Sequence, residues 1–320
     1  MKKKIGIPKA LLYYYYKDTW KYFFKYLQLD IVESSKTNKE MLKTGERLAP
    51  DEACLSIKIF LGHVADIKDK CDYILIPRLF SVKKNEQVCT NFNCLYDLVN
   101  NTFDDINIIN YNVDLTSHEG ELLGFLKLGR DLGFSYIESY KAYKFAKEKS
   151  KAIRLNDEDI QRKNLKKDNL KILLSGHPYN LYDDMIGTQI IKFLEKEGVT
   201  ILYSNKIDHT LIDSECEKIS TDIHWTHSKE MMASINYYYD KVDGIIIISS
   251  FPCGPDSLSN ELAIRKVKNI PILKLIFEDF NSDIGIITRL ESYFDILKAK
   301  KGGAKWKQLV FHILEITIIQ

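Results

Sequence analysis

The sequence of 320 residues lacks the short motifs that mark nucleotide-binding and many hydrolytic enzymes. It contains no Walker A phosphate loop, no G-x-G-x-x-G after a strand, no H-E-x-x-H and no G-x-S-x-G. These absences leave the chain without a recognisable means of hydrolysing ATP or binding a dinucleotide. None of its six cysteines forms a C-x-x-C pair, so we do not expect a structural zinc ribbon.

Long apolar segments and a charge imbalance are absent as well. The longest apolar runs, such as Ile245–Ile248, have the length of a strand, and none approaches the roughly 20 residues of a membrane-spanning helix. The basic start runs into Ile5–Pro8 without the apolar core of a signal peptide. A net charge of +2 gives no electrostatic case for binding nucleic acid or an anionic membrane. We therefore expect a soluble, cytoplasmic protein whose cysteines do not form structural disulfides.

The sequence does contain one repeated pattern, in a composition that is ordinary for a globular protein. A short β-branched run is followed by a turn with proline or glycine and then by an amphipathic helix. The expected strands lie at 4–8, 73–77, 106–109, 171–174, 200–203, 244–249 and 270–276. Strands that alternate with helices of ten or more residues favour parallel sheets built from βαβ units.

The pattern stops once, in a polar stretch after Lys151, and then starts again. We interpret this stretch as a helix end followed by an exposed connection. The sequence thus predicts an α/β protein with two doubly wound, Rossmann-like parallel-sheet lobes that face an interlobe cleft. The expected division is an N-terminal lobe at 1–155, a polar connection at 156–167 and a C-terminal lobe at 168–320. The apolar stretch Trp306–Gln320 is expected to dock as a helix or strand, with no role assigned.

Polar and reactive residues follow several of the expected strands directly. Arg78 follows the strand at 73–77, His177 follows the strand at 171–174, and Cys253 follows the strand at 244–249. Asp256 and Ser257 then fall in the first turn of the next helix. Because ligands bind beyond the carboxyl ends of parallel strands, these turns would line one cleft if the lobes face each other.

Three cysteines stand out by position. Cys253 lies directly beyond a buried strand, Cys54 precedes the expected helix Leu55–Ile67, and Cys89 lies in an irregular segment. Backbone amides at a helix start favour a thiolate, which is the form that binds metal. On spacing alone, however, these could equally be ordinary buried or loop cysteines, because free cysteine is among the most buried residue types.

The remaining candidates are weaker. We interpret Cys71 and Cys216 as non-ligands. His177 could fix its own turn through a hydrogen bond or contact a ligand, and the pair His224-x-x-His227 more often caps or packs than binds metal. The run Tyr13–Tyr16 covers all sides of a helix and is expected to pack.

Several segments carry a family resemblance, in order, over most of the chain up to about residue 298. They are 5–11, 35–38, 51–54, 60–64, 77–78, 176–180, 253–257 and 288–291. With these segments the chain resembles the stand-alone family related to 2-hydroxyacyl-CoA dehydratase activases and to the dehydratase subunits themselves. Proteins of this wider group carry oxygen-sensitive iron–sulfur clusters, held by cysteines between α/β lobes, in anaerobic metabolism.

The resemblance implies a cofactor and a partner. In the dehydratase subunits three thiolates hold a 4Fe-4S cluster and leave one iron for water or substrate, whereas a related branch holds a double-cubane cluster at a homodimer. Electrons arrive from a separate activator, a homodimeric actin-like ATPase with its own cluster. That ATPase is not in this chain, so an ATP-driven step would need it as a partner.

Carried over position by position, the resemblance makes Cys54, Cys89 and Cys253 the cluster ligands. Cys94 follows Cys89 closely and could replace or supplement it. Our leading hypothesis is an iron–sulfur protein that takes low-potential electrons from the activator and passes them to a small substrate such as an acyl-CoA. Here Arg78 and His177 would be substrate or supporting contacts, and Asp256 with Ser257 would hold the helix that presents Cys253. The alternative is a cluster-free module that binds a small molecule or docks on a dehydratase.

Overall fold

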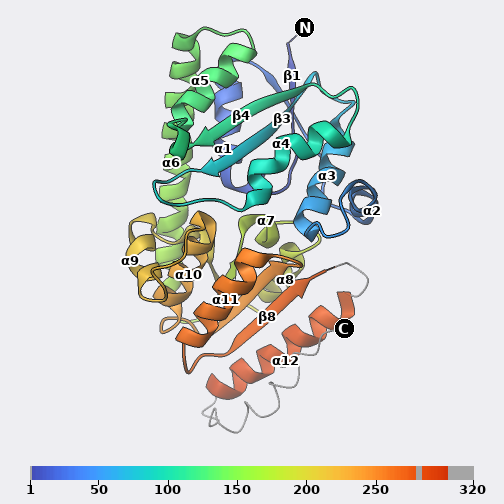
Figure 1. Ribbon diagram of the computed structural model, residues 1–320. Helices are drawn as coiled ribbons and strands as arrows, with labels where there is room; N and C mark the ends of the chain where they lie inside the picture. The colour runs from blue at the N-terminus through green and yellow to red at the C-terminus, as the bar shows by residue number, and fades with distance from the viewer. Residues whose placement is uncertain (1, 279–282, 302–320) are drawn as a thin grey trace.

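The computed structural model describes residues 2–278 and 283–301, and these form two α/β lobes stacked one on the other (Figure 1). Each lobe holds a four-stranded sheet in which all strands are parallel. The first sheet has the order β2-β1-β3-β4, with β1 Lys4–Ile7, β2 Asp30–Glu33, β3 Tyr73–Ser81 and β4 Ile108–Asp114. The second has the order β6-β5-β7-β8, with β5 Lys171–Gly176, β6 Thr200–Tyr203, β7 Gly244–Ser250 and β8 Ile272–Phe277. The predicted fold class is confirmed.

The two sheets share one topology, and this places their switch points. In each, the chain starts on an inner strand, moves to one edge and then returns past its starting strand to the other side. The crevice between oppositely directed connections therefore lies beyond β1 and β3 in one lobe and beyond β5 and β7 in the other. Every residue of β7 is buried, as its continuous apolar run predicts for a strand covered on both faces.

Helices cover both faces of each sheet (Figure 1). Those of the first lobe are α1 Tyr13–Tyr26, α2 Lys39–Leu48, α3 Leu55–Ile67, α4 Thr90–Thr102 and α5 Glu121–Asp131. Those of the second are α7 Pro178–Leu181, α8 Gly187–Lys196, α9 Ile212–Glu217, α10 Thr226–Tyr238, α11 Gly254–Lys266 and α12 Asp283–Lys301. No described helix has the length and apolar character needed to cross a membrane.

One long helix, α6 Tyr136–Leu165, runs from the first lobe into the second (Figure 1). The helix that we expected to end near Ala152 therefore continues through most of the polar stretch. The reason is that the side chain of Gln161 is buried there. Its Nε2 donates to the carbonyl of Tyr203 at 2.7 Å, and its Oε1 accepts from the Tyr203 amide at 2.8 Å. The boundaries at 155 and 168 remain predictions, and Trp306–Gln320 lies outside the described residues.

Helices α2 and α3 cross at two glycines, one on each helix. A Cβ atom at Gly45 would lie 1.7 Å from the carbonyl oxygen of Lys58, and one at Gly62 would lie 2.2 Å from that of Met41. Real side chains never approach a backbone that closely. The two helices are therefore in direct backbone contact, and the contact at Lys58 lies four residues after Cys54.

A buried chain of polar side chains joins the lobes. His63 on α3 contacts Ser34 Oγ through Nδ1 at 2.7 Å and Thr37 Oγ1 through Nε2 at 2.9 Å. Thr37 donates its hydroxyl proton to Asp183 of the second lobe at 2.5 Å, so it must accept from the Nε2–H of His63. All members of the chain are satisfied when the imidazole is neutral, and burial lowers the pKa of His63 to about 4.

This depressed pKa predicts a pH dependence of stability that His63→Gln should reduce. The unfolded state takes up a proton near pH 6.5 and the folded state only near pH 4, so the advantage of the neutral ring is lost as the pH falls between them. We expect the difference in unfolding free energy, wild type minus variant, to fall by about 3 kcal/mol between pH 7 and pH 4. Burial raises the pKa of Asp183 to about 6, so its contribution to the unfolding free energy has the opposite pH dependence. Because wild type and variant both carry Asp183, this contribution cancels in the difference between them. Urea denaturation at each pH measures this difference, and parallel pH profiles would contradict the assignment.

Candidate metal centre

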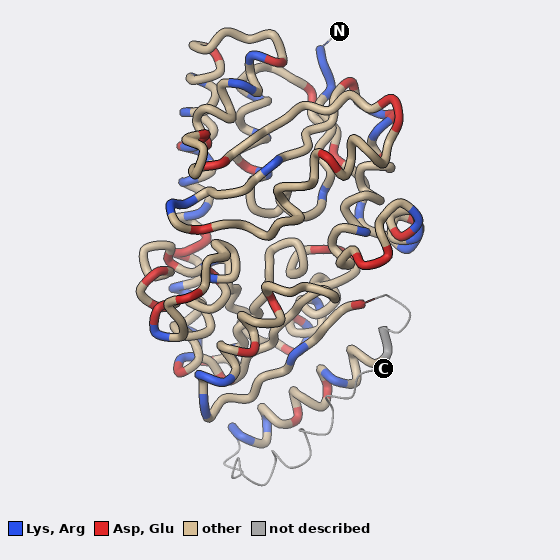
Figure 2. Tube along the Cα trace, in the orientation of Figure 1, with Lys and Arg blue, Asp and Glu red and all other residues tan. Residues whose placement is uncertain are grey.

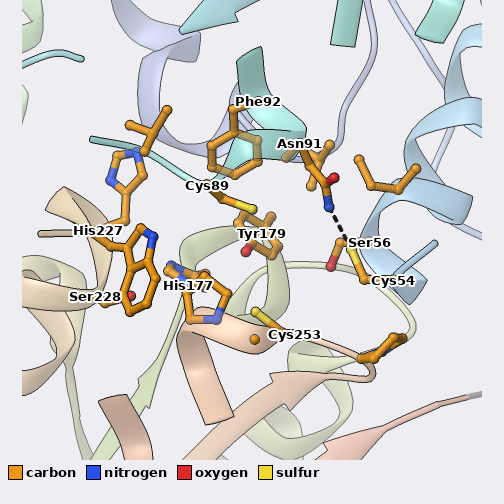
Figure 3. Close-up of a pocket in the computed structure, with 17 residues that line it drawn as sticks. Cys54, Ser56, Cys89, Asn91, Phe92, His177, Tyr179, His227, Ser228 and Cys253 are labelled. Atoms are coloured by element: carbon orange, nitrogen blue, oxygen red, sulfur yellow. Dashed lines mark hydrogen bonds between the residues drawn. The ribbon is translucent and has the colours of Figure 1, made fainter. Parts of the chain in front are cut away.

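A cavity of about 630 Å³, counting the part open to solvent, lies between the lobes (Figure 3). Its walls include Leu11 after β1, Cys89 after β3, His177 after β5 and Cys253 after β7. The carboxyl ends of both sheets therefore face the same space. This is the interlobe cleft that the sequence predicts.

Cys54, Cys89 and Cys253 all line this cavity (Figure 3). Each is the residue that precedes the first turn of a helix: Cys54 for α3, Cys89 for α4 and Cys253 for α11. The structure thus brings together three cysteines that are far apart in the sequence and come from both lobes. Cys94 is exposed on α4 and is not among the lining residues. Its placement gives no support to the alternative that it replaces Cys89.

Backbone hydrogen bonds fix the segments that carry these cysteines. The amide of Leu55, next to Cys54, donates to the carbonyl of Phe251, two residues before Cys253, at 2.9 Å. The Cys89 segment is attached to the start of α10, because the Gln87 amide donates to His224 at 2.8 Å and its carbonyl accepts from Thr226 at 3.0 Å. The three thiols are therefore positioned by contacts across the lobe interface.

A buried ion pair adds to the attachment of the Cys89 segment. Glu86 is buried, and its carboxylate lies 2.8 Å from the ammonium group of Lys229 on α10. Lys83 of the same segment also pairs with Glu86, at 3.2 Å.

Burial sets the protonation of the thiols in the metal-free protein. Loss of solvent raises the pKa of Cys54, Cys89 and Cys253, and the carboxylate of Asp256 raises all three further. Backbone amides in the first turn of each helix act in the opposite direction, as expected, but burial outweighs them. The amides thus act in the predicted direction, but the pKa of each thiol lies above its usual value because burial is the larger effect.

The cavity offers three sulfur donors, although the described residues form no ready-made metal site. Within residues 2–278 and 283–301, no group of three or more His, Cys, Asp or Glu side chains is close enough to hold one ion. The three thiols instead stand around a shared cavity, and no carboxylate is among its described lining residues. Soft sulfur donors without oxygen ligands are what iron–sulfur clusters require. In donor type, with three thiols and no lining carboxylate, the cavity matches the cluster that the resemblance implies.

His177 has both ring nitrogens engaged. Nδ1 lies 2.8 Å from the hydroxyl of Tyr15, and Nε2 lies 2.8 Å from Oδ1 of the buried Asp256, at ion-pair distance but without the alignment of a hydrogen bond. The ring also stacks on Tyr179 with centroids 4.9 Å apart. These contacts favour the interpretation that His177 shapes the cavity wall.

The other two predicted residues differ in their placement. Ser257 donates its hydroxyl to the carbonyl of Cys253 at 2.8 Å, at the start of α11, whereas neither carboxylate oxygen of Asp256 has a hydrogen-bond partner among the described residues. Arg78 does not line the cavity. It donates to the carbonyl of Asn93 at 3.1 Å and pairs with Asp97, so it joins β3 to α4. Its placement gives no support to a substrate contact.

Sequence reasoning missed the aromatic wall around these groups. Tyr15, which we expected only to pack, contacts His177 and stacks on His227 with centroids 3.8 Å apart. His227 itself lines the cavity, together with Trp225. The sequence gives only a weak signal for this wall. Aromatic residues at helical spacing, such as Tyr15, are usually part of the core, and the pair His224-x-x-His227 has no further candidate ligand near it in sequence.

Comparison with known proteins identifies the family. The family model described as "CoA enzyme activase uncharacterised domain (DUF2229)" matches residues 4–207, which is more than half of the chain. The chain belongs to this family. The resemblance inferred from the sequence is thus confirmed at the level of a CoA-enzyme activase-related protein. Cys54 and Cys89 fall within the matched stretch and Cys253 lies beyond it.

The other comparisons add little. No curated protein matches the chain. Among solved structures it is similar to the SBP FpvC from Pseudomonas aeruginosa in complex with Mn2+, at 12% identity and a TM-score of 0.30. The match covers 95% of this chain and 100% of that one, and at this TM-score the likeness supports no conclusion.

Proposed function

We propose that this member of the CoA-enzyme activase family is an iron–sulfur protein in which Cys54, Cys89 and Cys253 hold one cluster between the lobes. One observation carries the proposal. Three cysteines from separate segments of both lobes, each at the start of a helix, line a single cavity. Independent burial of three unrelated cysteines would not place all of them at helix starts around the same space.

The helix starts explain how the cavity would tolerate the charge of bound thiolates. Each helix directs the positive end of its dipole and its free amides at its cysteine, which favours negative charge there. Metal binding removes the thiol protons, and the metal charge then replaces the solvation that burial takes away. The cluster would supply one-electron chemistry at low potential, whereas this chain would bind it, exclude water and position the substrate.

The proposal extends to a partner and a substrate class. Following the family resemblance, we propose that a separate ATP-dependent, actin-like activator with its own cluster delivers the electrons. The substrate would be a small molecule, such as the acyl part of an acyl-CoA, held in the cavity. Membership of a CoA-enzyme activase family supports the CoA-dependent setting.

Anaerobic purification and reconstitution with iron and sulfide tests the proposal. We expect a brown protein with about four iron atoms and four sulfides per chain, and a paramagnetic resonance signal on reduction. A colourless protein without iron that still binds a CoA ester would contradict the cluster and favour the alternative, an accessory module of the same system.

A further inference from the structure

The cavity is bordered by the N-terminal ends of four helices of equal length, and one of them carries no cysteine. Helices α3, α4, α10 and α11 have 13 residues each, and the residue preceding each of them lines the cavity. Three of these residues are the cysteines, and the fourth is Trp225, before α10. Behind it, His227 and Ser228 in the first turn of α10 also line the cavity (Figure 3).

The start of α10 holds polar groups that no described part of the chain satisfies. Nε2 of His227 and Oγ of Ser228 have no hydrogen-bond partner among the described residues, although the two residues are only 8% and 1% exposed. The Thr226 amide donates to Gln87, but those of His227 and Ser228 have no acceptor within the described ranges. Buried polar groups are almost always paired, so this set indicates a missing acceptor.

The cavity lining leaves the positive end of α10 without a neutralising carboxylate. The described lining contains no Asp, Glu, Lys or Arg, and Asp256 is buried outside the lining with its Oδ1 2.8 Å from Nε2 of His177. Burial lowers the pKa of His227 to about 3, and the ring is therefore neutral and able to donate from Nε2. Glu230, the nearest acidic residue along α10, has its pKa raised to about 7 by burial and so loses part of its charge near neutral pH.

We propose that the N-terminus of α10 binds an oxygen that carries full or partial negative charge, in a carboxylate or a polarised carbonyl group. His227 Nε2, Ser228 Oγ and the two free amides donate to it. Figure 3 shows His227 and Ser228 across the cavity from Cys54, so a molecule held at α10 would occupy the same cavity as the three cysteines. The inference rests on the proposed function in one respect, namely that this molecule is the substrate of the cluster protein.

The test uses the metal-free protein and propionate as the probe. We expect titration with propionate to shift the backbone amide resonances of His227 and Ser228 in nitrogen-15 NMR spectra. Propionamide has the same size without the charge and should bind roughly tenfold more weakly, because charge-assisted hydrogen bonds are about twice as strong. Ser228→Ala should weaken propionate about three- to tenfold, and so should His227→Phe, which keeps the ring that stacks on Tyr15.

Ser56→Ala is the matched control. Ser56 also lines the cavity at a helix start, but its hydroxyl is already bonded to Ser250 at 3.0 Å and lies 3.3 Å from Asn180. Its removal should leave the affinity for propionate unchanged. If His227→Phe does not fold, the propionate affinity of Ser228→Ala alone tests the inference.

Two outcomes would overturn the inference. These are unshifted amides in the titration with propionate, or full affinity for propionate in Ser228→Ala. Iron and sulfide are measured separately on reconstituted protein. Binding without a cluster would therefore contradict only the proposed function, and a cluster without binding would contradict only this inference.

Discussion

Replacing Cys253 with alanine is expected to lower the iron bound after anaerobic reconstitution from about four atoms per chain to fewer than about one. The physical reason is that Cys253 is the only thiol contributed by the second lobe among the described cavity-lining residues. Cys54 and Cys89 would then remain as two ligands from one side, and no lining carboxylate could substitute. Iron and acid-labile sulfide assays on the purified variant measure the loss.

Two other cysteines provide controls. Cys216 is buried beside Ser220 in the second lobe, and Cys94 is exposed on α4, so alanine at either position should leave iron and sulfide at the wild-type level. Unchanged iron in Cys253→Ala would contradict the ligand set. A loss in Cys94→Ala together with retention in Cys89→Ala would show that Cys94 is the ligand from α4.

Gly45→Ala is expected to destabilise the protein by about 3 kcal/mol or more. The new Cβ would lie 1.7 Å from the carbonyl oxygen of Lys58, and this backbone atom near the start of α3 cannot move aside without shifting the helix. Lys58 is four residues after Cys54, so we also expect lower iron content in any folded fraction. Urea denaturation gives the change in unfolding free energy.

The control for this substitution is Gly254→Ala, in the first turn of α11. A Cβ there has no atom within 4 Å, so the unfolding free energy should stay within about 1 kcal/mol of wild type. Similar stability of Gly45→Ala and Gly254→Ala would contradict the close crossing of α2 and α3.

The sequence predicts the fold well because the strands are local signals. The buried apolar run of β7 and the turns after β1 and β5 are readable from neighbouring residues alone. The extent of α6 is not, because Gln161 looks like a surface residue until Tyr203 of the other lobe satisfies its amide. Only the assembled lobes show why that polar segment stays helical.

Arg78 illustrates a second limit. Pro77 suggests a strand end, yet β3 continues to Ser81. Beyond Ile74, β3 pairs only with β4, so the hydrogen-bonding edge of the strand toward β1 has no partner there. The missing N–H of Pro77 therefore costs the sheet no hydrogen bond on that edge. Arg78 is therefore part of the strand and not of the cavity-lining turn.

The candidate site was predictable in its cysteines but not in its surroundings. The rule that parallel strands present ligands at their carboxyl ends, with the family resemblance, selects Cys54, Cys89 and Cys253. The contacts of His177 with Tyr15 and Asp256 join residues 162 and 79 positions apart, and no local pattern indicates them.

The central claim is that three cysteines from two lobes hold one cluster, and anomalous diffraction at the iron absorption edge tests it most directly. In a crystal of the anaerobically reconstituted protein, we expect iron scattering in the interlobe cavity, in contact with the sulfurs of Cys54, Cys89 and Cys253. Iron at other cysteines, or a cavity without iron in protein that contains it, would contradict the account.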